Sequence, residues 1–199
     1  MAVRHDPIAK QCRDFDLSPA VLGYDKKNTN RHPGANTRKK YSEYGMQLKE
    51  KQKLKFIYGV QENQFRHYYE IAEKQAGVTG ENIIKLLERR LDNVVFRMGM
   101  AKTLREARQL VRHNHFRVNG KKVDIPSLLL KAGDVVSVKD RSRSSAKFKE
   151  LAELAETRLS PSWLEVDREN LTATLKQLPI REELDYEVNE QLVVELYSK

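Results

Sequence analysis

The sequence is short of the residues and segments that mark several classes of protein. It has one cysteine, Cys12, and one tryptophan, Trp163, among 199 residues. A single cysteine excludes an intramolecular disulfide, which is compatible with a reducing cytosol. No apolar run approaches the roughly 18 residues that span a bilayer, and we expect no secretory signal because the first residues lack an apolar segment. P-loop, HExxH and GxSxG motifs are also absent, so we expect no enzyme and no cofactor.

The charge of the chain is unevenly distributed. Hydrophobic residues at 39% and charged residues at 33% fit a globular protein with a modest core, and the net charge is +9. Residues 1–60 hold 13 Lys/Arg and 6 Asp/Glu, residues 91–148 hold 13 and 5, and residues 149–199 hold 6 and 12. Basic blocks of this kind indicate a polyanionic partner. An anionic membrane would favour a basic helix with Trp or Phe on its apolar face, but Trp163 lies in the acidic block, which favours nucleic acid.

The first half of the chain predicts an arm followed by helices. Residues 1–41 are polar and rich in turn signals, with a short helical patch near Pro7 to Cys12. Ser42 is a candidate N-cap, and apolar residues at helical spacing predict three short helices across residues 42–90.

Residues 91–148 change from helical to strand-like spacing. Apolar residues predict a helix from Leu91 to Met98. Thr103 to Glu106 reads TLRE, a capping box in which Glu106 is expected to reach back to the cap amide. Asn119-Gly120 between short apolar strands predicts a type I′ hairpin, and a further strand, DVVSV, follows. Residues 149–199 predict a helix and then short strands or a mixture of strands and helix, with Trp163 in the core.

Arginines on the second of these helices form a stripe at i, i+3 and i+7: Arg105, Arg108 and Arg112. A solvated helix face is the alternative interpretation. Arg108 and Arg112 are like charges one turn apart, which costs a few tenths of a kcal/mol, and Glu106 lies off that face. Pairing the hairpin through its two-residue turn places Arg117 opposite Lys122, a second unfavourable pair. An external anion explains both, so we expect Ala at Arg108, Arg112 and Arg117 to leave stability unchanged or slightly raised.

The basic residues continue from the helix into the hairpin. This favours recognition of the backbone of a folded RNA over recognition of base sequence. Phosphate contacts fix register, and a helix–hairpin surface can follow an RNA backbone. A DNA-binding helix–turn–helix is weakened as an alternative because the basic surface extends beyond the helix.

A family resemblance rests on two quoted stretches and their flanks. RLDNVVFRMGMAKTLREARQLVRHNHFRVNGKKV and IPSLLLKAGDVVSV resemble the small RNA-binding module named after the fourth protein of the small ribosomal subunit. The flanks SEYGMQLKEKQKLKFIYGVQENQFRHYY, TGENIIKLLERRLDNVVFRMG, PSWLEVD and NEQLVVELYSK resemble that ribosomal protein's bacterial-type family itself. The resemblance covers about residues 42–199.

The resemblance implies an α+β fold with a discontinuous, mainly helical domain and an inserted small α/β RNA-binding module. In that module two helices pack on a short, strongly bent sheet. The implied domains are a basic arm at 1–41, a helical domain made of 42–90 and 149–199, and the module at 91–148.

The resemblance also implies a function and partners. The chain is expected to be a structural constituent of the small ribosomal subunit, bound to ribosomes in a bacterial-type cytoplasm rather than in an organelle. It is expected to bind a junction in the 5′ domain of the small-subunit ribosomal RNA, to nucleate assembly, and to contribute to accuracy with neighbouring protein five. Messenger RNA near the entry channel is a further expected partner. A free RNA-binding regulator and an RNA-modification factor remain alternatives.

One branch of the family carries a zinc-binding cysteine cluster in the arm, and this chain resembles the zinc-free branch. Structural zinc requires four nitrogen or sulfur ligands. Cys12, His5 and His32 supply at most three, at irregular spacing, so we expect no metal.

Charge, spacing and the resemblance together select a set of candidate RNA-binding residues. Arg38, Lys39 and Lys40 correspond to the family's basic stretch near messenger RNA. Tyr69 could stack on a base or belong to the core, and His115 could instead pair with Asp124 across the hairpin. The full set is Arg38, Lys39, Lys40, Lys49, Lys53, Arg66, Tyr69, Arg97, Lys102, Arg105, Arg108, Gln109, Arg112, His113, His115, Arg117, Asn119, Lys121, Lys122 and Arg141.

Overall fold

The chain divides into two compact units in a computed structural model that describes residues 7–25, 41–156 and 159–198. One unit is formed by residues 1–83 with 185–199, and the other by residues 84–184. The boundary falls inside helix α4 (Thr79–Glu88). Each unit buries apolar side chains of its own, such as Phe65 in the first and Phe116 in the second.

The first unit is helical in its described part. Its elements besides the start of α4 are α1 (Ile8–Asp14), η1 (Pro19–Leu22), α2 (Glu43–Ile57), α3 (Glu62–Glu73) and α9 (Glu190–Tyr197). The three helices expected across residues 42–90 are confirmed. Ser42 caps α2 as expected, because its hydroxyl accepts a hydrogen bond from the Gly45 amide at 3.2 Å.

The described part of the expected arm contains a packed segment. Cys12 at the end of α1 is fully buried, and Leu17 and Leu22 are nearly so. The Phe15 ring lies 5.6 Å from the Phe56 ring of α2. The short helix expected near Pro7 to Cys12 is present as α1, and the segment packs on α2 through the contact between Phe15 and Phe56.

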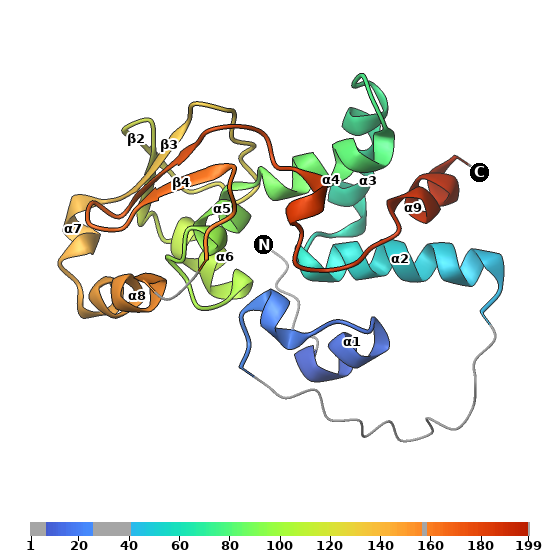
Figure 1. Cartoon of the computed structure of the whole chain (residues 1–199), viewed down its shortest axis with the longest axis horizontal. Helices are drawn as coiled ribbons and strands as arrows, with labels where there is room; N and C mark the ends of the chain where they lie inside the picture. The colour runs from blue at the N-terminus through green and yellow to red at the C-terminus, as the bar shows by residue number, and fades with distance from the viewer. Residues whose placement is uncertain (1–6, 26–40, 157–158, 199) are drawn as a thin grey trace. The chain divides into compact units, whose positions relative to one another are not determined.

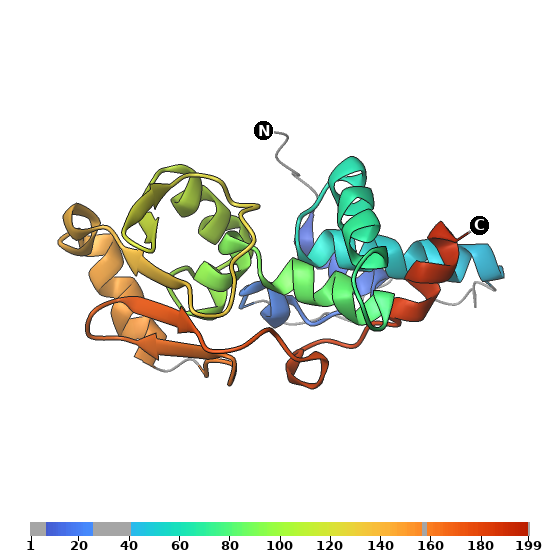
Figure 2. The ribbon, with the colours of Figure 1, turned by 90° about the horizontal axis from the view of Figure 1, so that it is seen from above.

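The C-terminal helix α9 lies beside α2 in both views of the ribbon (Figures 1 and 2). The Tyr197 ring of α9 stacks on Tyr69 of α3 at 4.7 Å between centroids, and its hydroxyl donates to Glu62 at 2.8 Å. Glu62 also accepts from Lys51 at 2.8 Å and Lys55 at 2.5 Å. This cluster ties the last residues of the chain to α2 and α3.

The second unit combines helices with a sheet. Its helices besides the end of α4 are α5 (Leu91–Arg97), α6 (Leu104–Arg112), α7 (Asp140–Arg143), α8 (Ala146–Glu156) and η2 (Arg181–Glu183). Its strands are β1 (Phe116–Val118), β2 (Lys121–Val123), β3 (Val135–Val138), β4 (Leu164–Asp167) and β5 (Thr172–Leu175). The α+β class is confirmed.

The five strands form one antiparallel sheet in the order β2-β1-β3-β5-β4. Alternate side chains, such as Phe116, Val136 and Leu175, point to one face, where they are fully buried. Helices α5, α6 and α8 cover this face (Figure 1). Trp163, which was expected in the core, is 2% exposed and belongs to the same cluster.

The observed division differs from the expected one at residues 149–184. These residues were assigned to the helical domain, but α8 and the β4–β5 hairpin lie in the second unit. The reason is a strand pairing, because β5 lies antiparallel beside β3, with Val135 opposite Thr174, and so joins the sheet. The sheet therefore has five strands rather than the short sheet of the expected module. From Asp185 onward the chain belongs to the first unit.

Local signals position the basic elements of the second unit. The Thr103 hydroxyl accepts from the Glu106 amide at 3.1 Å, which confirms the cap of α6. The Glu106 carboxylate accepts from the Lys102 amide at 2.6 Å, one residue before the expected cap amide. Asn119 and Gly120 adopt positive φ angles of 49° and 76°, as the expected hairpin turn requires.

Candidate nucleic-acid interface

The stripe of arginines on α6 exists, but its members have different surroundings. Arg105 and Arg112 are exposed, whereas Arg108 is 22% exposed at its side chain. Arg108 donates from Nε and Nη2 to Oδ2 of Asp92 at 2.8 and 2.7 Å. The expectation that Arg108 lacks a counter-charge is therefore wrong, since Asp92 of α5 supplies one.

Asp92 is the centre of a buried charged network. Its side chain is 5% exposed, and that of its neighbour Arg90 is 2% exposed. Arg90 donates from Nε to Oδ1 at 3.0 Å and from Nη2 to Oδ2 at 2.8 Å. The Asn93 amide adds a further hydrogen bond to Oδ1 at 3.0 Å. Two guanidinium groups thus share one carboxylate, and the three side chains carry a net charge of +1.

The hairpin has the predicted register, with Arg117 opposite Lys122. Arg117 is nevertheless paired with Asp140 of α7 at 3.1 Å. Lys121 and Lys122 are exposed and have no acidic partner among the described residues. The like-charge argument consequently holds for Lys122 and not for Arg117.

The side chain of Asn119 makes hydrogen bonds that stabilise the hairpin turn. Its Nδ2 donates to Asp134 at 2.8 Å, and its Oδ1 accepts from the Val135 amide at 2.9 Å. These hydrogen bonds join the hairpin turn to the start of β3. Both ends of this amide side chain are thus engaged within the protein, which gives Asn119 a structural role in the turn.

His113 and His115 lie close together, with 6.3 Å between ring centroids. His115 shares a hydrogen bond with Ser142 of α7 at 2.9 Å, not with Asp124. Partial burial, followed by the positive charges of His113, Lys139 and Lys147, lowers the pKa of His115. Burial is the larger cause of the shift, and the neighbouring basic groups act in the same direction.

Several other candidate residues are engaged within the protein. Arg97 pairs with Glu88 at 3.2 Å, Lys102 with Glu150 at 2.5 Å, and Arg66 with Glu70 at 3.5 Å. The last two pairs are exposed, so water and salt weaken them and phosphate can compete with them. Arg97 is more enclosed, at 15% side-chain exposure, which favours a structural role.

The candidates on α2 and α3 also include both buried residues and residues at the surface. Tyr69 is 7% exposed and stacked on Tyr197, which argues against base stacking. Lys53 is 9% exposed. The Lys49 ammonium lies 5.0 Å from the Tyr41 ring centre, a cation–π contact at the surface. Arg38, Lys39 and Lys40 lie outside the described residues.

The remaining cations gather on the second unit. Besides Gln109, an exposed polar candidate on α6, the exposed candidates there without an acidic partner among the described residues are Arg112, His113, Lys121, Lys122 and Arg141. We call the four of these with a permanently charged side chain, Arg112, Lys121, Lys122 and Arg141, the unpaired cations. They come from the end of α6, the β2 strand and α7. Lys139 and Lys147 were not among the candidates, because their approach to His115 depends on the tertiary fold. Lys147 also pairs with Glu106 at 2.5 Å.

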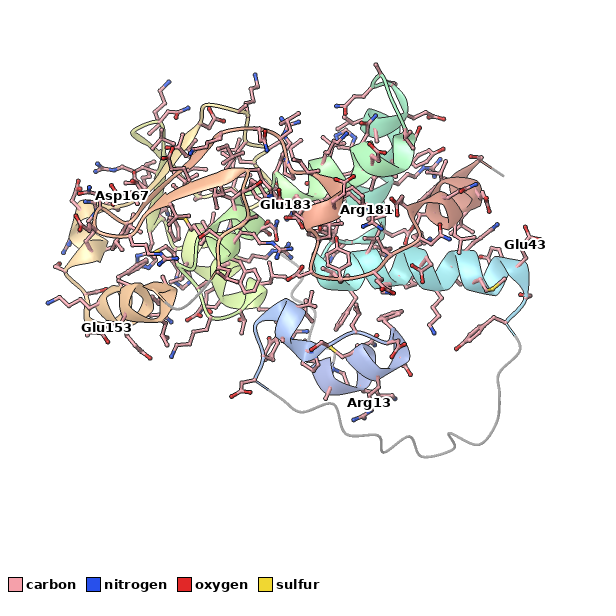
Figure 3. All side chains as sticks on the ribbon, in the orientation of Figure 1. Arg13, Glu43, Glu153, Asp167, Arg181 and Glu183 are labelled. Carbon is pink, nitrogen blue, oxygen red and sulfur yellow. The ribbon has the colours of Figure 1, made fainter. Side chains whose placement is uncertain are left out.

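Three carboxylates of residues 149–184 are labelled in Figure 3: Glu153 on α8, Asp167 on β4 and Glu183 on η2. Glu153 and Asp167 are both exposed. Hydrogen bonds from the Asn170 amide and side chain lower the pKa of Asp167. This acidic segment is folded into the same unit as the cations, so the unit has basic and acidic surface elements.

Neither a metal centre nor a membrane span is found in the described ranges. No group of three or more His, Cys, Asp and Glu side chains in residues 7–25, 41–156 and 159–198 is placed to hold a metal ion. Burial raises the pKa of the Cys12 thiol, and His5 and His32 lie outside these ranges. No described helix is long and apolar enough to cross a membrane.

Comparison with known proteins gives concordant matches over most of the chain. Residues 4–88 match the family model of the ribosomal protein S4/S9 N-terminal domain, and residues 89–136 match the S4 domain. Small ribosomal subunit protein uS4 of Lachnospira eligens is 55% identical over 199 residues, which is 100% of both chains. The uS4 of Agathobacter rectalis is 52% identical over the same extent. The uS4 of Clostridioides difficile is 60% identical over 162 residues, 81% of this chain and 78% of the relative.

Proposed function

The chain belongs to the ribosomal protein S4 family, and on this premise we propose that it is a primary binder of small-subunit ribosomal RNA. The family is structural rather than enzymatic, and its relatives are small-subunit proteins with RNA-binding domains. The resemblance of the full chain to bacterial uS4 supports a ribosome-bound place in the cytoplasm.

The observation that carries the RNA-binding proposal is the set of unpaired cations on the second unit. Arg112 at the end of α6 and Lys121 and Lys122 on β2 are exposed and lack a described carboxylate partner. Binding phosphate costs such a group no existing ion pair, and it releases counterions from the RNA. We propose that these side chains contact the RNA backbone, with Gln109, Arg105 and the Asp92-held Arg108 in the same surface.

We further propose the finer activities that the family resemblance implies. The protein grips a helical junction in the 5′ domain of the ribosomal RNA and nucleates subunit assembly. It adjoins protein five, with which it contributes to translational accuracy, and its basic stretch at residues 38–40 lies near messenger RNA at the entry channel. The domain plan behind this proposal places the RNA-binding module between the two parts of the helical unit.

Binding to a defined transcript tests the proposal. The RNA is a transcript of the 5′ domain of Lachnospira eligens small-subunit ribosomal RNA, with a transcript of a 3′ domain as the matched control. We expect tight binding to the first that weakens by about 5 to 7 log units per decade of salt for roughly eight phosphate contacts. Equal affinity for both transcripts would contradict specific recognition.

Sedimentation separates the proposal from a free RNA-binding regulator. In gradients at high salt the protein is expected to sediment with small subunits. Recovery from the ribosome-free fraction alone would contradict a structural role. Tritium release from uridine-labelled RNA tests the RNA-modification alternative, and none is expected.

A further inference from the structure

Arg89 is a partly buried arginine outside the candidate set, in the turn between α4 and α5 of the second unit. Its Nε donates to the Leu130 carbonyl at 2.6 Å, and its backbone carbonyl accepts from the Leu130 amide at 2.9 Å. The next residue, Arg90, forms a β-bridge with Leu129. The Arg89 side chain is therefore fixed at Nε by a neighbouring segment that is itself hydrogen-bonded to the turn.

The terminal nitrogens of Arg89 have no hydrogen-bond or ion-pair partner in the described part of the chain. A guanidinium has five N–H donors, and Nε carries only one of them. Nη1 and Nη2 bond to no described residue, and neither is closed off from solvent. Partial burial lowers the pKa of the Arg89 guanidinium, while the negative charge of Asp134 acts in the opposite direction. Because arginine stays protonated at neutral pH, these accessible donors carry a positive charge.

The carboxylate of Asp134 is engaged by other groups. Its Oδ1 accepts from Asn119 Nδ2 at 2.8 Å, and its Oδ2 accepts from the Lys131 amide at 2.7 Å. No hydrogen bond or ion pair joins Asp134 to Arg89. Lys131 is exposed and has no acidic partner among the described residues. Two cationic residues thus adjoin one carboxylate that already stabilises the 131–134 turn.

The surroundings of Arg89 adjoin the basic hairpin. Asn119, which bonds to Asp134, is the first residue of the hairpin turn, and Lys121 of β2 follows two residues later. Lys121 is one of the unpaired cations. A guanidinium fork matches the geometry of phosphate oxygens, and a fork that is already held loses less rotamer freedom on binding. The position and the chemistry of Arg89 therefore both suit a phosphate of the RNA that the hairpin contacts.

We propose that Arg89 is a further RNA-contacting residue, whose terminal nitrogens bind a backbone phosphate beside the hairpin turn while Leu130 holds Nε. The inference rests on the proposed function and deepens it, because it extends the contact surface from β2 to the turn that precedes α5. The competing role is structural, with Arg89 only tying Leu130 to the end of α4.

Substitution of Arg89 in the full chain tests the inference with the 5′-domain transcript. R89A is expected to weaken binding about tenfold and to reduce the salt slope by one contact, about 0.7 to 0.9 log units per decade. R89K keeps the charge but replaces the fork by one ammonium, so it should weaken binding about threefold or more with nearly the original slope.

The matched control is K74A, which removes one exposed positive charge from the first unit. It should keep the original slope and an affinity within about twofold of the unaltered protein. A purely structural role would lower the unfolding temperature of R89A and leave its slope equal to that of K74A, which would overturn the inference.

Protection from phenylglyoxal, which condenses with arginine guanidinium groups, tests the contact on the unaltered protein and so covers the case in which R89A fails to fold by circular dichroism. Arg89 is expected to be modified in the free protein and to lose this modification when the 5′-domain transcript is bound, as measured by mass spectrometry. Arg168, exposed in the acidic segment, is the internal reference and should react equally in both samples. Equal modification of Arg89 with and without RNA, or none in the free protein, would overturn the inference.

The two proposals fail in different ways. Failure of the unaltered protein to bind the transcript would overturn the proposed function and this inference with it. Normal binding by the unaltered protein, with no protection of Arg89 and no change of slope in R89A, would overturn this inference alone.

Discussion

Arg108 and Arg112 occupy successive turns of α6, but only Arg108 has an acidic partner among the described residues. Arg108 makes two hydrogen bonds of 2.8 and 2.7 Å to a buried carboxylate. Arg112 is exposed and has no acidic partner among the described residues. An arginine that neutralises a buried charge contributes to folding, whereas an exposed arginine beside a like charge does not.

The two arginines are expected to respond differently to truncation. R108A should lower the free energy of unfolding by about 1–3 kcal/mol, because charged hydrogen bonds to Asp92 are lost. R112A should change it by less than about 0.5 kcal/mol, as surface substitutions do. Urea denaturation of both variants measures the difference. Equal values would mean that the Arg108–Asp92 contact adds no stability. Ala at Arg108 is therefore expected to destabilise the fold, and Ala at Arg117 removes the ion pair with Asp140.

His115 reports on the same surface through its titration. Its pKa lies below the ordinary value because of partial burial and the nearby His113, Lys139 and Lys147. A phosphate at this site would favour the protonated ring. The pKa of His115, followed by NMR, is therefore expected to rise on RNA binding, and affinity should increase as pH falls toward that pKa. An unchanged or lower pKa in the complex would place the RNA elsewhere.

At the scale of elements, the carboxylate of Glu62 is one of the contacts that hold α9 against α2 and α3. Partial burial alone would raise the pKa of Glu62, but hydrogen bonds from Lys51, Lys55 and Tyr197 outweigh it and bring the pKa to about 2. The folded state therefore favours the ionised carboxylate. Its stabilisation is fully present above the ordinary value of 4.5 and is lost as pH falls through about 2.

Acid titration of the Glu62 contact tests this fastening. Between pH 4.5 and about 2 the unaltered protein is expected to lose stability more steeply than E62Q, whose side chain does not titrate. The side chain is 45% exposed, so solvent screening keeps the difference modest. Parallel pH profiles of the two proteins would contradict the ionised contact.

Removal of the Tyr197 hydroxyl tests the same contact from α9. Y197F retains the ring stacking on Tyr69 but loses the hydrogen bond to Glu62. It should lower the free energy of unfolding by about 0.5–1.5 kcal/mol. No loss in thermal or urea unfolding would show that the hydroxyl is dispensable.

Elements with local signals could be predicted from the sequence. The cap at Thr103 and the turn at Asn119-Gly120 depend on neighbours within a few residues, and both are confirmed. The register of Arg117 with Lys122 follows from that turn. The counter-charges Asp92 and Asp140 lie 16 and 23 residues from their arginines, so spacing within one element could not reveal them.

At the scale of the whole molecule, the first unit is built from segments at both ends of the chain, residues 1–83 and 185–199. The β4–β5 hairpin, by contrast, joins β3 through backbone hydrogen bonds. This pairing needs the free edge of β3, which exists only once β1 and β3 have formed the sheet. The periodicity of residues 164–175 could therefore not predict which unit the hairpin joins.

The most direct test of the account is the salt dependence of RNA binding after removal of three unpaired cations, Arg112, Lys121 and Lys122. The triple Ala variant is expected to bind the 5′-domain transcript with a slope shallower by about 2 to 3 log units per decade of salt. Its unfolding temperature should be unchanged or slightly higher. A control triple with the same charge change, K74A/R168A/K176A, lies outside the basic segments and should keep the original slope. An unchanged slope for the first triple, or equal slopes for both, would contradict the claim that these cations form the RNA-binding surface.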